Sequence, residues 1–191
     1  QYEAGFKWAT DNLSLYATVF FTDVDPRAVN FVFGGEAILT TQESKGVELD
    51  GIWQTDGGFS VAVNATWLES DINSDDPTID GNETERQPGW QVRLTPAYDF
   101  SFGNMEGSVY ATYTAVDDRW GEALNINVLE GYDELDLGVI VRVNESFIVQ
   151  VAADNVTDEE ALTESDPRTF TAPNGRFIMP RNIRFSVGYE F

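Results

Sequence analysis

A chain of 191 residues with 42% hydrophobic and 13% aromatic residues is long enough to bury a core and too apolar to be disordered. It carries 33 Asp and Glu against 11 Lys and Arg, and this net charge of −22 argues against nucleic acid as a partner because the phosphates would be repelled. Cysteine and histidine are both absent, which excludes disulfides, thiolate or histidine metal sites and histidine-based catalytic triads.

Apolar and polar residues alternate along most of the chain, which is the period of a β-strand with two different faces and not that of a helix. Turn residues interrupt this pattern at intervals. The pattern predicts about nine strands, in chain order at residues 1–9, 13–33, 36–55, 58–70, 89–100, 105–117, 132–143, 146–156 and 181–191. No apolar run approaches the roughly 18 residues that a transmembrane helix needs.

Two of these strands contain residues that predict an irregular pairing. The sequence DVDP at residues 23–26 interrupts the second strand, so we expect its middle to bulge outward. The sequence SKG at residues 44–46 suggests another bulge in the third strand.

The predicted connections differ in length between the two ends of the strands. Tight connections lie at residues 10–12, 56–57, 101–104 and 144–145, and long acidic connections lie at residues 70–88, 117–131 and 157–180. The short connection near Gly34 and Gly35 joins strands that are long enough to project as a loop would. Short turns at one end and long loops at the other are typical of outer-membrane β-barrels.

Tryptophan positions also indicate a barrel. Trp8 and Trp53 lie beside tight turns, whereas Trp67 and Trp90 lie at the opposite strand ends, where aromatic girdles would border the lipid. The alternative is a soluble antiparallel sandwich with one buried face on each strand. A sandwich explains the period of two equally well, but it gives no reason for the tryptophan positions or for the separation of short and long loops.

An odd number of strands leaves the first and last strands running in the same direction, whereas bacterial single-chain barrels have an even number. Because open strand edges are not viable in lipid, we expect that strands before Gln1 are missing or come from another chain. Charged residues opposite the apolar face, such as Lys7, Asp50 and Arg93, favour a large barrel with a polar lumen. The predicted fold class is therefore all-β, an antiparallel transmembrane β-barrel segment of about nine strands from a larger barrel.

Several stretches of the sequence resemble the barrels of TonB-dependent outer-membrane receptors and transporters. They are QYEAGFKWATDNLSLYATVFFTDV, SKGVELDGIWQTDGGFSVAVNATWLES, VQVAADNVTDEEAL, DPRTF and MPRNIRFSVGYEF, in this order. The resemblance extends over nearly the whole chain. It implies that residues 1–191 are the C-terminal portion of the barrel, with the N-terminal strands and the plug domain of the family absent.

The resemblance further implies a role in the bacterial cell outer membrane, importing a scarce nutrient such as a metal chelate, a cofactor or an oligosaccharide. Expected partners are outer-membrane lipid, the TonB system through the missing N-terminal part, the barrel-assembly machinery, and remaining barrel strands or a plug from the same or another chain. The alternatives are a porin-like or structural barrel fragment assembled with other chains, or a secreted β-rich binding module. No enzyme activity is expected, because the paired carboxylates of Asp117 and Asp118 are better interpreted as the edge of a loop than as an acid–base pair.

The terminal strand carries the predicted assembly signal. The resemblance implies that the assembly machinery recognises an aromatic C-terminus preceded by alternating apolar residues, as in outer-membrane barrels generally. The residues concerned are Phe185, Val187, Tyr189 and Phe191. The alternative is that these side chains only face lipid, and the two roles are compatible.

Arginines and aromatic residues in two of the long loops are predicted as ligand contacts, because exposed loops over a vestibule commonly carry binding residues. The candidates are Arg119, Trp120, Arg168, Phe170, Arg176 and Phe177. The alternative is that these residues pack the loops against their neighbours.

Calcium is the one cofactor that the sequence suggests, in the acidic stretch at residues 71–85. Asp71, Asn73 and Asp75 fit the first three oxygen positions of an EF-hand loop. The match then fails, because Asp76 stands where the template requires glycine and Asn82 where it requires glutamate. A solvated acidic loop is the alternative.

Overall fold

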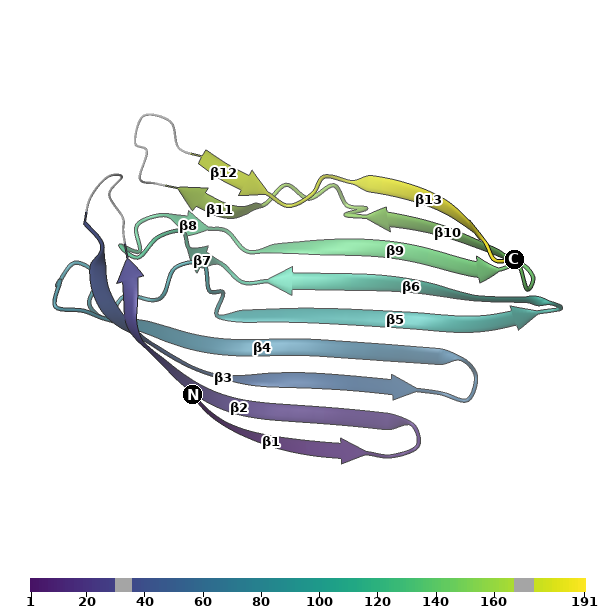
Figure 1. Ribbon diagram of the computed structural model, residues 1–191, viewed down its shortest axis with the longest axis horizontal. Coiled ribbons are helices and arrows are strands. Elements are labelled where there is room, and N and C mark those ends of the chain that lie inside the picture. The colour runs from purple at the N-terminus through teal and green to yellow at the C-terminus, as the bar shows by residue number, and fades with distance from the viewer. Residues whose placement is uncertain (30–35, 167–173) are drawn as a thin grey trace.

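The computed structural model describes residues 1–29, 36–166 and 174–191. Nine strands form one antiparallel sheet in the order β1-β2-β3-β4-β5-β6-β9-β10-β13 (Figure 1). Their bounds are β1 (Tyr2–Ala9), β2 (Leu13–Val29), β3 (Ile38–Gln54), β4 (Phe59–Asn73), β5 (Trp90–Phe102), β6 (Met105–Val116), β9 (Tyr132–Arg142), β10 (Phe147–Asp154) and β13 (Asn182–Tyr189). The described residues include no helix able to cross a membrane. The predicted all-β antiparallel fold with nine main strands is confirmed.

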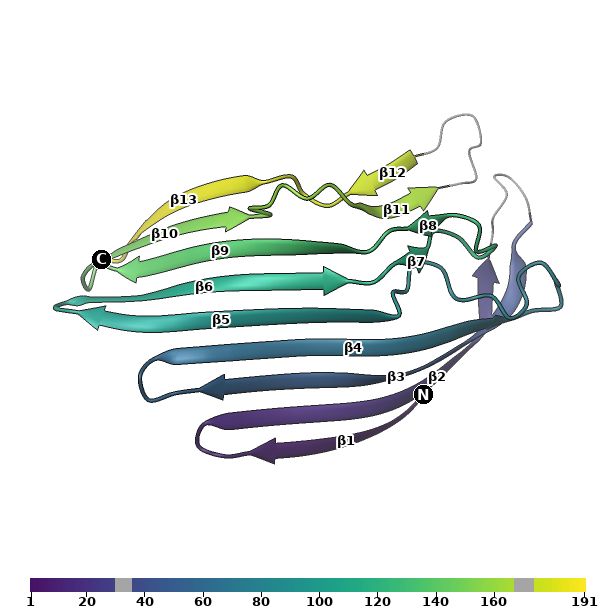
Figure 2. The same ribbon diagram turned by 180° about the vertical axis from the view of Figure 1, so that it is seen from behind.

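Two small hairpins lie within the long connections. β7 (Arg119–Trp120) pairs with β8 (Val128–Leu129), and β11 (Leu162–Asp166) pairs with β12 (Asn174–Phe177). Figure 2 shows the tight turns at one end of the sheet and both hairpins at the other. Residues 30–33 of the predicted second strand and the connection at Gly34 and Gly35 lie outside the described residues.

The strand register gives the sheet one apolar face from its first strand to its last. Register partners share a face, and along the middle of the strands from β1 to β13 the pairings on this face join mainly apolar residues. One such row contains Trp8, Leu15, Gly51, Val63, Leu94, Tyr113 and Leu135. Toward the long-loop end the same face carries charged partners such as Lys45 and Glu69. Large side chains on this face are open to the surroundings, as Phe6 (62% exposed) and Phe185 (68%) illustrate. A continuous apolar face of this size is typical of a surface that lipid covers.

The predicted bulge in β2 is confirmed, and the predicted bulge in β3 is wrong. Two residues of β2 oppose one of β3 between the pairs Val24–Gln42 and Arg27–Thr40, whereas the pairing through residues 44–46 is regular. Gly46 instead lies close to both neighbouring strands, since a Cβ there would collide with the carbonyl oxygen of Trp67 and stand 2.7 Å from Cζ of its partner Phe20. The glycine therefore makes room for the backbone of β4 and for the Phe20 ring of β2, and not for an extra residue.

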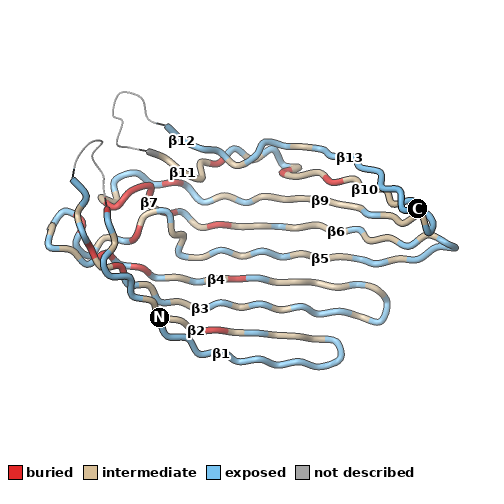
Figure 3. The backbone as a smooth tube through the Cα atoms, in the orientation of Figure 1, coloured by how far each residue is buried: buried red, intermediate tan, exposed pale blue. Residues whose placement is uncertain are grey.

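The buried apolar residues do not lie between two layers, because the two small hairpins are the only other sheets of the described residues. Val29, Ile72, Ile79 and Ala123 form a cluster where the long ends of β2 and β4 meet the loops. Figure 3 shows most buried segments at this end, whereas the strands are half-buried or exposed along most of their length. The sandwich alternative thus lacks the two-sheet core that defines it.

Gly107→Ala is expected to destabilise the sheet by about 1–3 kcal/mol through overpacking. Gly107 pairs with Phe100, and a Cβ at this position would stand 2.6 Å from Phe100 Cζ and 2.7 Å from the carbonyl oxygen of Ile140. The measurement is denaturant-induced unfolding of the protein refolded into lipid vesicles. Gly188→Ala is the matched control, because the nearest atom to its Cβ position is 3.9 Å away. Equal losses in the two variants would contradict the close packing at Gly107.

Candidate functional site: the polar wall and the loop layer

The face of the sheet opposite the apolar one forms a polar wall. One row of register partners on this face contains Lys7, Tyr16, Asp50, Asn64, Arg93, Thr114 and Glu134. Asn64 Nδ2 donates to Asp50 Oδ1 at 2.5 Å, and Arg93 Nε donates to Thr114 Oγ1 at 3.4 Å. A wall of hydrogen-bonding side chains is suited to a water-filled passage, because each polar group finds a neighbour or water as its partner.

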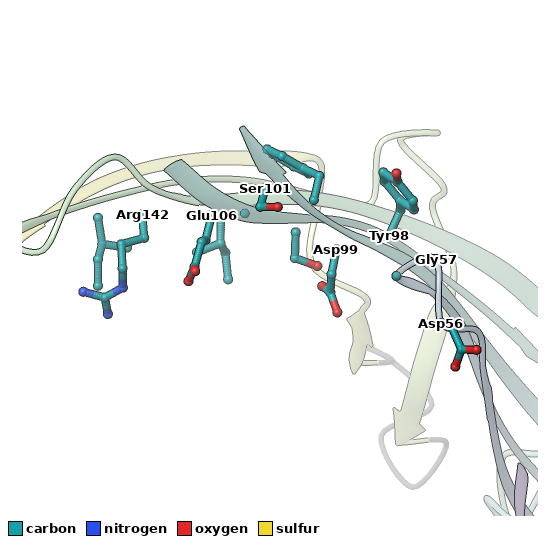
Figure 4. A pocket seen from close by; sticks show the side chains of 13 residues that line it. Asp56, Gly57, Tyr98, Asp99, Ser101, Glu106 and Arg142 are labelled. Carbon is teal, nitrogen blue, oxygen red and sulfur yellow. The ribbon is translucent and has the colours of Figure 1, made fainter. Parts of the chain in front are cut away.

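At the tight-turn end, the polar wall contains a groove of about 740 Å³. In Figure 4, Asp99, Glu106 and Arg142 point to one side of the sheet, whereas Tyr98 points to the other. Arg142 Nη1 lies 3.1 Å from Glu190 Oε2, so this arginine is already paired within the wall. The unpaired charged side chains of the groove are therefore mainly carboxylates.

At the opposite end, the long connections interlock into a loop layer, which comprises residues 74–89, 117–131, 155–166 and 174–181. Glu83 N donates to Asn125 Oδ1 at 2.8 Å, and Asn125 Nδ2 donates back to Glu83 O at 3.0 Å. Arg86 N donates to Trp120 O at 2.7 Å. These bonds join the first two long connections side by side.

An ion pair fastens the loop layer to the long end of β2. Arg27 Nη2 lies 2.6 Å from Glu85 Oε1, and Arg27 Nη1 lies 3.1 Å from Glu85 Oε2. Both side chains are largely shielded, at 25% and 19% exposure. A two-pronged arginine–carboxylate pair of this kind fixes orientation as well as distance.

Two arginines hold the β11–β12 hairpin in the loop layer. Arg119 is only 8% exposed, and its Nη2 donates to the carbonyl oxygens of Leu162 at 3.1 Å and Thr163 at 3.3 Å. Arg86 Nη1 pairs with Glu164 Oε1 at 2.6 Å. Because these arginines come from two other connections, all three long connections form one unit.

Between β4 and the loop layer lies a cavity of about 470 Å³. Its lining includes Glu69, Asp71, Glu83, Asp117, Asp118, Arg119 and Trp120. Burial, followed by the hydrogen bond and the charge of neighbouring Asp118, raises the pKa of Asp117 above its usual value. The lining thus favours cationic or hydrogen-bond-donating groups over anions.

The predicted ligand contacts take different positions in the loop layer. Arg119 and Trp120 both line the acidic cavity. Trp120 is half-buried, whereas Arg119 is buried and its guanidinium bonds to the hairpin. Arg176 and Phe177 are exposed on β12. The remaining two candidates, Arg168 and Phe170, lie outside the described residues.

Sequence reasoning missed two residues that organise this region, Arg86 and Glu122. Arg86 bonds to Glu164, which is 78 residues away in the sequence, and no local sequence pattern predicts a contact over that separation. Glu122 accepts hydrogen bonds from the backbone of its own turn, at Ile126 N and Asn127 N. An acidic residue just before a turn is a weak sequence signal that its carboxylate accepts hydrogen bonds from the backbone of that turn, and the sequence around Glu122 contains this signal.

The three calcium candidates are spread along the end of β4 and the following bend. Asp71 pairs with Glu43 across the strands, and Asn73 is the last residue of β4. Within the described ranges, no group of three or more acidic side chains is placed to hold a metal ion. Asp76 serves the turn instead, since its Oδ1 accepts hydrogen bonds from Thr78 Oγ1 at 2.7 Å and Thr78 N at 2.9 Å, which lower the pKa of Asp76.

The terminal strand places its alternating residues on the apolar face. Phe185 and Val187 pair with valines of β10, and Tyr189 pairs with Phe147. The rings of Tyr189 and Phe147 lie 4.9 Å apart, and Phe191 follows at 5.7 Å from Tyr189. The chain therefore ends in an exposed aromatic cluster at the tight-turn end of the sheet.

Comparisons with known proteins agree with this architecture. A family model described as "TonB dependent receptor-like, beta-barrel" matches residues 1–156. A comparison with curated protein sequences finds no match.

Several solved structures share the fold over almost the whole chain. The ferric yersiniabactin uptake receptor FyuA from Yersinia pestis has a TM-score of 0.85 at 18% identity, covering 99% of this chain and 29% of that one. The ferric preacinetobactin receptor BauA from Acinetobacter baumannii has a TM-score of 0.81 at 18% identity, with coverages of 99% and 29%. The copper transporter OprC has a TM-score of 0.77 at 15% identity, with coverages of 99% and 30%. This chain therefore spans less than a third of the length of these proteins.

Proposed function

The chain belongs to the TonB-dependent receptor β-barrel family, and on that basis we propose that it forms the C-terminal part of a transporter barrel that imports a metal chelate. Members of this family are transport receptors of the bacterial outer membrane and not enzymes. The single observation that carries the proposal is the two-faced sheet, which is apolar on one side and polar on the other and has the hydrogen-bonded loop layer at one end. The named substrates of similar proteins, ferric yersiniabactin, ferric preacinetobactin and copper, favour a metal chelate over an oligosaccharide.

We propose that residues 1–191 correspond to the last strands of a larger barrel, which other strands complete. In support, the sheet is open at β1 and β13, and lipid does not tolerate open strand edges. A plug domain would fill the passage against the polar wall, and the TonB system would act through the N-terminal part. The terminal residues Phe185, Val187, Tyr189 and Phe191 would serve as the address for the assembly machinery as well as a lipid anchor.

In this proposal the loop layer makes the first contact with the substrate. Trp120, Arg176 and Phe177 remain candidates for direct contact, together with Arg168 and Phe170. Arg119 would act indirectly, since it is buried and holds the hairpin that carries Arg176. The acidic carboxylates of the loop layer would favour chelates of low negative charge.

The test is uptake by the complete receptor that contains this chain, in an otherwise receptor-deficient strain. We expect saturable accumulation of one radiolabelled iron or copper chelate that is lost in a TonB-deficient strain. Accumulation that is unsaturable and independent of TonB would contradict transport of this kind and favour the porin-like alternative. The matched control is the same receptor without its N-terminal part, which should accumulate nothing.

A further inference from the structure

The bulge in β2 reverses which face of the sheet the odd-numbered residues of this strand occupy. Before the bulge, Val19 and Phe21 lie on the apolar face. Beyond it, Arg27 pairs with Thr40, and the even-numbered residues of β3 belong to the face of the polar wall. Strict alternation along β2 would have put Arg27 on the apolar face, so the extra residue of the bulge turns it toward the loop layer.

Contacts at the end of β2 agree with this reversal. Val29 is 4% exposed and belongs to the buried cluster that includes Ile72 and Ile79. Arg27 bonds to Glu85 through both of its Nη atoms, at 2.6 and 3.1 Å. The end of β2 therefore has one apolar and one charged attachment to the first long connection.

The residue that follows Glu85 has a main-chain conformation that depends on its surroundings. Arg86 has a φ of 64°, in the left-handed region that residues other than glycine rarely adopt. Such a conformation costs about 1–3 kcal/mol and persists only where neighbouring contacts determine it. Arg27 fixes the preceding residue, and Glu164 pairs with the side chain of Arg86 itself. Arg27 is therefore one of the contacts that hold the main chain at Arg86.

The main chain at Arg86 in turn holds Trp120, since Arg86 N donates to Trp120 O at 2.7 Å. Trp120 belongs to β7, which has only two residues and pairs with the equally short β8. A ladder of this length fixes its residues weakly, so the bond from Arg86 contributes to the position of Trp120. The half-buried Trp120 lines the acidic cavity. A series of contacts thus leads from the end of β2 to this cavity.

We propose that Arg27 is a positioning residue for Trp120, which it reaches through Glu85 and the main chain of Arg86. The bulge turns the guanidinium toward the loop layer, and the ion pair then fixes the segment that bonds to Trp120. A two-pronged pair is suited to this role because it sets orientation as well as distance, and both side chains are largely shielded from water. Contact of Trp120 with the substrate rests on the proposed function, whereas its positioning by Arg27 does not.

The test is amide hydrogen exchange in the detergent-purified complete receptor carrying Arg27→Ala, with no substrate added. Exchange at Arg86 N should accelerate by about tenfold to 100-fold, because the substitution removes two charge-assisted hydrogen bonds from the adjacent residue. Exchange in the middle of β5 should stay as in the wild type. Unchanged exchange at Arg86, or equal acceleration in β5, would overturn the proposal.

Fluorine NMR of the receptor labelled with fluorotryptophan separates positioning of Trp120 from a purely structural attachment of the first connection. The resonance of Trp120 is identified by its loss in Trp120→Phe. Arg27→Ala should shift or broaden this resonance, because the ring is no longer held in one environment. The resonances of Trp8 and Trp53, near the tight turns at the opposite end, should not change. A Trp120 resonance identical to that of the wild type would contradict the proposed role of Arg27.

Two further variants test whether the ion pair itself is responsible. Adding Glu85→Ala to Arg27→Ala should not accelerate exchange at Arg86 beyond the single variant, because the interaction is already lost. Lys45→Ala is the matched control, since it removes an exposed ion pair with Glu69 and should accelerate exchange at Arg86 by less than about fivefold. Additive effects in the double variant, or a large effect of Lys45→Ala, would overturn the proposal. None of these measurements uses substrate, so the import function is tested separately.

Discussion

Leu94→Arg is expected to lower the free energy of unfolding in a lipid bilayer by about 2–4 kcal/mol. Leu94 lies on the apolar face of β5, between its register partners Val63 and Tyr113. A guanidinium at this position would have to leave water for hydrocarbon or distort the bilayer around it. The measurement is reversible denaturant unfolding from lipid vesicles, combined with the fraction of heat-modifiable, assembled barrel in cells.

The adjacent residue provides the control, because Thr95 lies on the polar wall. Thr95→Arg places the same charge one residue along the chain but on the opposite face. It should cost about 1 kcal/mol or less, the value of the hydrogen-bonding contact that Thr95 Oγ1 makes with Thr112 Oγ1 at 3.3 Å. Equal losses at the two positions would show that the two faces have been assigned wrongly.

Arg119→Ala is expected to release the β11–β12 hairpin from the loop layer while the barrel strands stay folded. The substitution removes a buried guanidinium and leaves the carbonyl oxygens of Leu162 and Thr163 without their donors. The local cost should be about 2–4 kcal/mol, so amide hydrogen exchange in β11 should accelerate by about 30-fold to 1,000-fold. Exchange in β5 and β6 should remain unchanged.

Arg176→Ala is the matched control on the same hairpin. Arg176 is 81% exposed, and its Nε lies 3.3 Å from Glu164 Oε2, so the pair is expected to contribute less than about 1 kcal/mol. Hydrogen exchange in β11 should therefore change only slightly. If Arg176→Ala accelerates exchange as much as Arg119→Ala does, burial is not what makes Arg119 important.

The main strands were predictable because one property, a period of two, repeats along each of them. Val61, Val63 and Ala65 share a face with Trp67, and any window over β4 shows this. β4 continues to Asn73, beyond the predicted end at residue 70, because β3 is long enough to pair with it as far as Thr41. A strand end depends on its partner, which the local sequence does not contain.

The loop layer was not predictable for a related physical reason. β7 and β8 have two residues each, too few for any period, and they exist because the surrounding contacts hold them. Arg119 was predicted to contact a ligand because it is a cation in an acidic chain. In the structure, however, its guanidinium donates hydrogen bonds to backbone oxygens. The bulge predicted at Ser44–Gly46 failed similarly, because the requirement for glycine comes from Trp67 and Phe20 on the two neighbouring strands.

Outside the bulge in β2, the register from β1 to β13 also constrains how a gene for such a barrel can change in length. Inserting or deleting one residue within a strand such as β5 would exchange its lipid-facing and water-facing side chains beyond that point. Inserting two residues would restore the alternation and only lengthen the strand. The spanning strands can therefore tolerate length changes in even steps, whereas the connections between them can change by any number of residues.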